Sequence, residues 1–145
     1  LDVYDFVDEP LILACSPNHA FAREQSVDIH KLQFERFIAF EKGVPTRVLI
    51  DGILSIYNLA LRPAMEFDNI ETIKRAIEIN SGVSILPKTT ISQEVASGTL
   101  CALPFSNDTF FRPTGIIVRK GKMLGEAGRY FIDLMRDETA SRASG

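Results

Sequence analysis

The sequence predicts an α/β domain with a largely parallel sheet. Short, continuous apolar runs, which are typical of strands buried on both faces, alternate with segments whose apolar residues recur every three or four positions. Glycine and proline stand at the boundaries between these segments. The 145 residues, 46% hydrophobic and 24% charged, have the balance of a soluble globular domain.

The first third of the chain contains two predicted strands and a short helix. Residues 11–16 form an apolar run that Pro17 ends, and residues 36–40 repeat the pattern before Gly43. Between them, Asp28 is placed to cap a short helix that runs through residues 32–34.

Residues 46–60 predict the longest helix, and Pro45 suits its first turn or the position just before it. Its predicted apolar stripe consists of Val48, Leu49, Ile53, Ile56, Tyr57 and Ala60. A strand at residues 64–67 follows, and then Asp68 or Asn69 caps a second helix. The stripe of that helix is Ile70, Ile73 and Ile77, with Ala76 beside it.

The second helix is expected to end at residues 80–82, with Gly82 as a left-handed cap. Residues 83–86 read as another buried strand, followed by a short helix at residues 89–96 that Gly98 stops. The last predicted elements are strands at residues 99–103 and 115–118 and an amphipathic helix at residues 124–135.

Charge and composition exclude several functions for this segment. Sixteen basic and nineteen acidic residues give a net charge of −3, which is no electrostatic footprint for a nucleic-acid backbone. No apolar run reaches membrane-spanning length, and the acidic first ten residues do not resemble a secretory signal. Cys15 and Cys101 lie in apolar runs and are read as buried thiols in a reducing cytoplasm.

Three stretches resemble, in order, the C-terminal part of LysR-type transcription regulators. The first stretch is Glu9-Pro-Leu-Ile-Leu-Ala-Cys-Ser-Pro-Asn-His-Ala-Phe-Ala22. It is similar to the family's strand and "P-x-x-H-P-L-A" turn, and Ala20 stands at the position of the usual second proline. Residues 68–87 resemble the helix that ends in "A-G-x-G-[IV]-x-[IL]-[LV]-P", with Asn80-Ser81-Gly82 where two glycines are usual. Residues 117–120 through 131–135 resemble the last strand and helix.

The resemblance implies a periplasmic-binding-protein-like fold, with one complete Rossmann-like lobe and the C-terminal remnant of the other lobe. Residues 1–10 would lead in from the other lobe, residues 11–87 would form the second lobe, and residues 88–137 the C-terminal part of the first. Residues 138–145 are expected to be a disordered tail. The winged helix-turn-helix of such regulators is not in this sequence, so DNA would be a partner only through another domain. A sheet without its first strands exposes apolar surface, so we expect a homo-oligomer, an exchange of elements between chains, or an atypical packing of the first-lobe remnant.

The resemblance also implies a function: a cytoplasmic sensor that binds a small anionic metabolite in the cleft between the lobes. An alternative is a solute-binding lobe of a transport-type binding protein. A dehydratase on the same fold would need a threonine-based catalytic motif that the sequence lacks. We predict no membrane partner, no cofactor, no metal and no catalytic residue, because two histidines and two distant cysteines make no zinc pattern. Cys15 and His19 lack a nucleophile–base spacing, and His19 is read as a turn residue.

Candidate effector-binding residues follow from the rule that ligands bind at the carboxyl ends of parallel strands. The resemblance implies a ligand-facing hydroxyl at Ser16, where the first strand enters the second lobe; alternatively, Ser16 bonds the local backbone. Val44, Pro45, Thr46 and Arg47 form a helix start, where free amides and the helix dipole favour an anion. Alternatively, Thr46 is a plain N-cap and Arg47 a solvated charge.

A second helix start offers Asn69 as a donor and Phe67 as a wall, although Phe67 also suits the core. Gly82 and Val83, at the return crossing, complete the predicted site.

Overall fold

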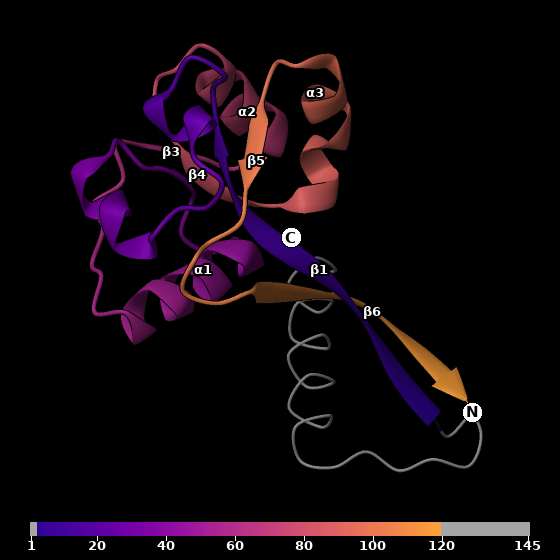
Figure 1. Ribbon diagram of the computed structural model, residues 1–145. Coiled ribbons are helices and arrows are strands. Elements are labelled where there is room, and N and C mark those ends of the chain that lie inside the picture. Colours follow the sequence, from indigo (N-terminus) through magenta and orange to yellow (C-terminus); the bar gives the residue numbers. More distant parts are fainter. Residues whose placement is uncertain (1–2, 120–145) are drawn as a thin grey trace. The chain divides into compact units, whose positions relative to one another are not determined.

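The computed structural model describes the backbone of residues 3–119 and the side chains of residues 9–112 (Figure 1). The chain divides into two compact units, Pro10–Phe110 and a second unit made of Leu1–Glu9 and Phe111–Gly145. β1 (Val3–Cys15) pairs with β6 (Phe110–Arg119). The expected helix at residues 124–135 and the tail at 138–145 lie outside the described residues.

The larger unit extends to Phe110. β5 (Cys101–Leu103) pairs in antiparallel register with β1, so that Leu13 faces Leu103 and Cys15 faces Cys101. This pairing keeps residues 88–110 in the same compact unit as the preceding strands.

The sheet of the larger unit is mixed. β2 (Ile38–Phe40) and β3 (Met65–Phe67) are parallel, whereas β1 is antiparallel to both β4 (Ser84–Pro87) and β5. A parallel bridge between Phe37 and Val83 joins the two groups of strands. One sheet has the order β4-β1-β5, with β6 also paired to β1, and β2 and β3 form a second, two-stranded sheet that the bridge attaches beside β4.

The core lies on both faces of these short strands. Leu13, Ile38 and Leu86 are fully buried, as continuous apolar strand runs predict. α2 (Ile70–Glu78) contacts β2 and β3, and α3 (Ser92–Ser97) contacts β5 (Figure 1). No helix in the described part of the chain has the length and apolar character needed to cross a membrane.

The expected helix boundaries are largely found. Asp28 caps the 3-10 helix η2 (Ile29–Phe34) by accepting from the His30 N–H at 2.9 Å. Pro45 is the first residue of α1 (Pro45–Ile56), and Asn69 rather than Asp68 caps α2. Two further 3-10 helices are η1 (Ala20–Arg23) and η3 (Lys88–Ile91), and Gly98 ends α3 at φ +82°.

The predicted stripe of α1 is partly correct, because Ile53 is buried and Leu49 and Tyr57 pack against the core. Val48 and Ile56 are 65% and 74% exposed, and the buried face contains Ile50, Ile53 and Leu54. Thr46 and Arg47 are buried on that face as well. The error arose because polar residues were assigned to solvent, although a buried Arg is stable when its donors find carbonyl and carboxylate partners.

Gly82 has a different role from the expected left-handed cap. Asn80 adopts the left-handed conformation, with φ +59°. A Cβ at Gly82 would lie 2.6 Å from the Arg36 carbonyl oxygen, closer than real Cβ atoms approach. Glycine is therefore required where the chain passes against the start of β2.

An ion-pair cluster links α2 to α3. The buried Lys74 ammonium lies 2.8 Å from Glu94 and 3.1 Å from Glu71, and it donates to the Thr90 carbonyl at 2.9 Å. Burial lowers the pKa of Lys74, but hydrogen bonds to Glu94 and Glu71 outweigh it and raise that pKa overall. The hydrogen bond from Lys74 lowers the pKa of the Glu94 carboxyl.

We predict that Gly82→Ala destabilises the fold by about 1–3 kcal/mol, because the added methyl group forces the backbone at Arg36 to shift. The matched control is Gly52→Ala in α1, where a Cβ meets no atom within 4 Å. Alanine favours a helix over glycine, so this control should be at least as stable as the parent chain. Urea unfolding of both variants measures the difference; equal losses would contradict the prediction.

We also predict that Glu94→Gln lowers stability at neutral pH. A carboxyl whose pKa is lowered by folding stabilises the protein above its unfolded value and loses this effect as pH falls through the folded value. The difference from the parent chain should therefore shrink as pH falls below about 4.5. Unfolding curves across this pH range test it, with exposed Glu24→Gln as control; a difference independent of pH would contradict it.

Candidate effector-binding edge

Two of the predicted segments lie together at one edge of the sheet. β2 and β3 are parallel, so the residues that follow Phe40 and Phe67 emerge at the same edge. The Glu41 N–H donates to the Phe67 carbonyl at 2.9 Å, which holds the two junctions side by side. The helix starts at Val44 and Asn69 therefore share one edge, as the crevice rule predicts.

The first junction begins α1 with backbone groups alone. Val44 is the N-cap, with φ −73° and ψ 128°, and its carbonyl accepts from the Arg47 N–H at 2.9 Å. Thr46 is therefore not the N-cap but the second helical residue, and it is 5% exposed. Its position combines a hydroxyl with the positive end of a twelve-residue helix.

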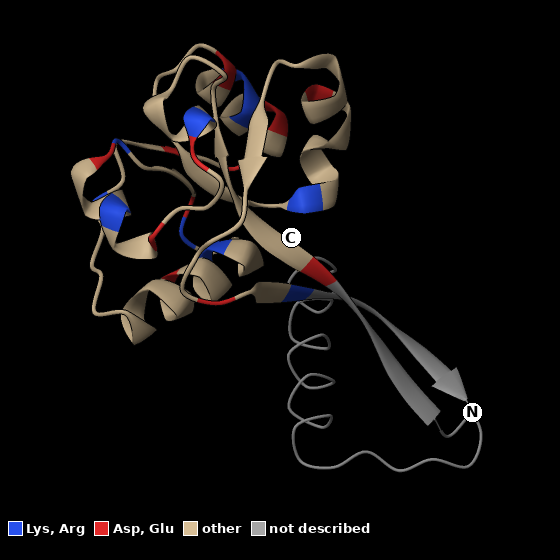
Figure 2. Cartoon of the chain, in the orientation of Figure 1, with Lys and Arg blue, Asp and Glu red and all other residues tan. Residues whose placement is uncertain are grey.

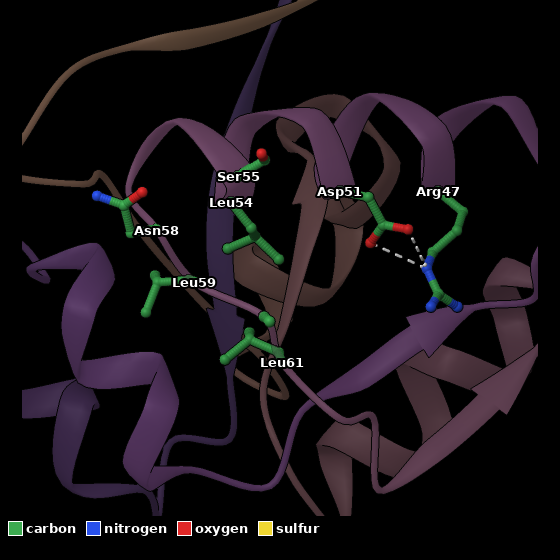
Figure 3. A pocket seen from close by; sticks show the side chains of 8 residues that line it. Arg47, Asp51, Leu54, Ser55, Asn58, Leu59 and Leu61 are labelled. Carbon is green, nitrogen blue, oxygen red and sulfur yellow. Dashed lines mark hydrogen bonds and ion pairs between the residues drawn. The ribbon is translucent and has the colours of Figure 1, made fainter.

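Arg47 is engaged by the protein itself. Its Nε donates to both oxygens of Asp51 at 3.0 and 2.9 Å, and its Nη1 donates to the Phe40 carbonyl at 2.8 Å and to Glu66 at 3.1 Å. Figure 3 shows the Arg47 and Asp51 side chains pointing toward one another. Two carboxylates offset its charge, so this guanidinium joins α1 to β2 and β3 rather than presenting a free cation.

Arg47 and Asp51 also lie at one end of a pocket of about 530 Å³ along α1 (Figure 3). The rest of its lining is Leu54, Ser55, Asn58, Leu59, Ala60 and Leu61. This lining is mainly aliphatic apart from the ion pair, and it does not include the helix start at Val44.

The second junction is organised by Asn69. Its side-chain oxygen accepts from the Glu71 N–H at 2.7 Å and caps α2, which leaves the same exposed amide group with its N–H donors at the edge. Phe67 ends β3 and is half-buried, so it belongs partly to the core.

A third junction at this edge was not predicted as part of the site. β4 runs parallel to β2 through the Phe37–Val83 bridge, so its last residue, Pro87, ends at the edge where β2 ends. Lys88 follows and is exposed, and the Thr90 hydroxyl donates to the Pro87 carbonyl at 2.6 Å, which fixes the turn. The signal in the sequence was a lysine directly after a buried strand.

Ser16, Gly82 and Val83 lie at the opposite edge, which corrects the expected position of Ser16. Because β1 is antiparallel to β4, Leu11 pairs with Pro87 and Ala14 with Ser84. The strand enters the larger unit near Leu11, and Ser16 lies beyond its far end. The buried Ser16 hydroxyl accepts from the Asn18 N–H at 3.1 Å, which is the local backbone role considered as the alternative.

His19 is a turn residue, as expected. Its Nδ1 accepts from the Phe21 N–H at 2.9 Å, and its Nε2 lies 2.5 Å from a Glu35 oxygen. Both ring nitrogens are thus engaged in holding η1. Along the ribbon of the larger unit, basic positions are interspersed with acidic ones (Figure 2).

Comparison with known proteins identifies one family. The model of the LysR substrate binding domain matches residues 1–140. The RuBisCO operon transcriptional regulator of Allochromatium vinosum is 27% identical over 135 residues, covering 93% of this chain and 45% of the relative. The HTH-type transcriptional activator CmpR of Synechocystis sp. is 28% identical over 145 residues, covering 99% and 48%. The chain thus spans about half the length of these curated relatives.

Comparison with solved structures agrees with this family assignment. The regulatory domain of CcmR from Synechocystis PCC6803, in complex with 2-PG, has a TM-score of 0.69 and 29% identity, covering 95% of this chain and 68% of that one. The effector binding domain of QuiR, in complex with shikimate, has a TM-score of 0.67 over 94% and 66%; its 20% identity supports the shared fold alone.

We predict that Arg47→Met destabilises the protein by about 1–3 kcal/mol, because the buried Phe40 carbonyl and two carboxylates lose their donor. Lys42→Met, in the exposed turn before the same helix, is the control and should change stability by less than about 0.5 kcal/mol. Chemical unfolding measures both values. A stable Arg47→Met variant would show that the network contributes little.

Proposed function

The chain belongs to the LysR substrate-binding domain family, and from that premise we propose that it senses a small organic anion at the shared strand edge. The observation that carries the proposal is the convergence of three strand-to-helix junctions, at Val44, Asn69 and Lys88, on one edge of the sheet. The regulators it matches, and not a transport protein or an enzyme, set the context for this role.

Hydrogen-bond donors and one cation at the edge favour an anion, whereas the exposed carboxylates of Glu41 and Asp68, which directly follow β2 and β3, oppose it. The start of α1 contributes a helix dipole and the Thr46 hydroxyl, Asn69 contributes amide donors, and Lys88 contributes an exposed cation. Arg47 takes no part in ligand binding in this proposal, because its Nε and Nη1 donate to oxygens of the protein. Val44 and Pro45 shape the turn, and Phe67 forms part of its apolar wall.

Regulation requires the ligand to bind one conformation of the domain more tightly than another. A ligand shifts a conformational equilibrium only as far as it binds one state better than the other. In a whole regulator of this family, we propose that the bound anion favours one conformation of this domain, which alters how paired subunits hold two DNA half-sites. We therefore propose a cytoplasmic homo-oligomer whose DNA contacts are made by another segment, because this chain has a net charge of −3.

We predict that a thermal-shift screen of small carboxylates and phosphates yields a saturable ligand of this chain. Thr46→Val and Lys88→Met should each weaken that ligand by about tenfold or more, the loss expected for a hydrogen bond to a charged group. Titration calorimetry measures the dissociation constants. Ser16→Ala, at the opposite edge, is the matched control and should bind as the parent does.

Three outcomes would count against the proposal. The absence of any saturable anion would remove its basis. Weakening by Ser16→Ala alone would move the site to the other edge of the sheet. Chemical turnover of a bound ligand would favour an enzyme on this fold.

A further inference from the structure

The two cysteines of the sequence face each other across adjacent strands. Cys15 in β1 is the register partner of Cys101 in β5. In an antiparallel pair, directly opposed residues point to the same face with Cβ atoms about 4.5–5.5 Å apart. A disulfide needs Cβ atoms about 3.5–4.5 Å apart, so closure requires the two strands to approach by only about 1 Å. Both cysteines are free thiols in the structure.

The two thiols differ in their access to solvent. Cys15 is completely buried, whereas Cys101 is partly exposed and lines a surface pocket of about 450 Å³. Gln25, Val95 and Leu100 are among its other lining residues. A small reagent can therefore reach Cys101 from solvent, whereas Cys15 has no exposed surface.

We propose that Cys15 and Cys101 are an oxidation site, at which exchange with a low-molecular-weight disulfide produces an intramolecular bond between β1 and β5. This inference does not depend on the proposed effector site. The cysteines lie on β1 and β5, whereas that site lies at the ends of β2, β3 and β4. Disulfides of cytoplasmic proteins are mostly transient and redox-sensing, so a reversible bond fits the proposed location.

The exchange takes place in two balanced steps. The Cys101 thiol loses its proton to solvent, and its sulfur attacks the small disulfide R–S–S–R, which releases one R–S⁻ and leaves Cys101–S–S–R. The Cys15 thiol then loses its proton to solvent and its sulfur attacks the Cys101 sulfur, which breaks the Cys101–S–S–R bond, releases the second R–S⁻ and forms the Cys15–Cys101 bond. The two protein thiols are oxidised by two electrons in total, and the small disulfide is reduced to two thiols.

The second step is expected to be the slow one. Burial above all, with the neighbouring Cys101 thiol and Glu35 carboxylate, raises the pKa of the Cys15 thiol to about 12. Below that value the thiolate fraction, and with it the closure rate, should rise by about tenfold for each pH unit. The mixed disulfide on Cys101 should therefore be a detectable intermediate near neutral pH.

The experiment treats the folded chain with bis(2-hydroxyethyl) disulfide and follows it by intact mass and by peptide mapping without reduction. We expect a transient adduct on Cys101, followed by a monomer that has lost two hydrogen atoms and contains a Cys15–Cys101 cross-linked peptide. Closure should be faster at higher pH, and dithiothreitol should restore both thiols.

Two variants assign the order of the steps. Cys15→Ser should keep a stable adduct on Cys101, and Cys101→Ser should leave Cys15 unmodified while the protein is folded. Mapping of the parent chain tests the proposal even if a variant fails to fold. A stable adduct on the parent, an intermolecular disulfide, or two thiols that remain free would each overturn it. So would equally fast modification of Cys15 in Cys101→Ser.

Discussion

The contact between the chain at Gly82–Val83 and the start of β2 is the constraint on which the rest of this structure depends. The Val83 N–H donates to the Arg36 carbonyl at 2.9 Å, and the Ile38 N–H donates to the Val83 carbonyl at 2.8 Å. These bonds make β4 a parallel neighbour of β2 and bring three strand ends to one edge. The contact is close enough that only glycine fits at position 82, so one backbone approach sets the layout of the candidate site.

Buried polar groups determine how the helices attach to this frame. Arg47 satisfies the Phe40 carbonyl at the end of β2, and Lys74 links α2 to α3 and to the turn that follows Lys88. Each cation is buried because oxygen atoms surround it, which offsets the cost of removing its charge from water. Arg47 and Lys74 therefore have structural roles, whereas the exposed charge of Lys88 remains at the edge of the sheet.

The resemblance to LysR-type regulators is confirmed by the family match and by the solved structures, whereas the identity of individual site residues remains a proposal. The structure divides the predicted residues into two groups. Val44, Thr46 and Asn69 lie at the shared edge, while Ser16 and Val83 lie at the opposite one. The cross-strand cysteines belong to this opposite side of the sheet, so oxidation would act on β1 and β5, whereas effector binding would act at the ends of β2, β3 and β4.

The sequence by itself determined the α/β class, most helix caps and the family, because periodicity, capping residues and short motifs are local properties of the chain. The direction of β1 was decided only by the tertiary structure, because pairing partners far apart in sequence leave no local signal. That direction places Ser16 away from the edge and Cys15 opposite Cys101. The phase of α1 was likewise decided by packing: Arg47 is buried since distant oxygens accept its hydrogen bonds, and no local pattern contains that information.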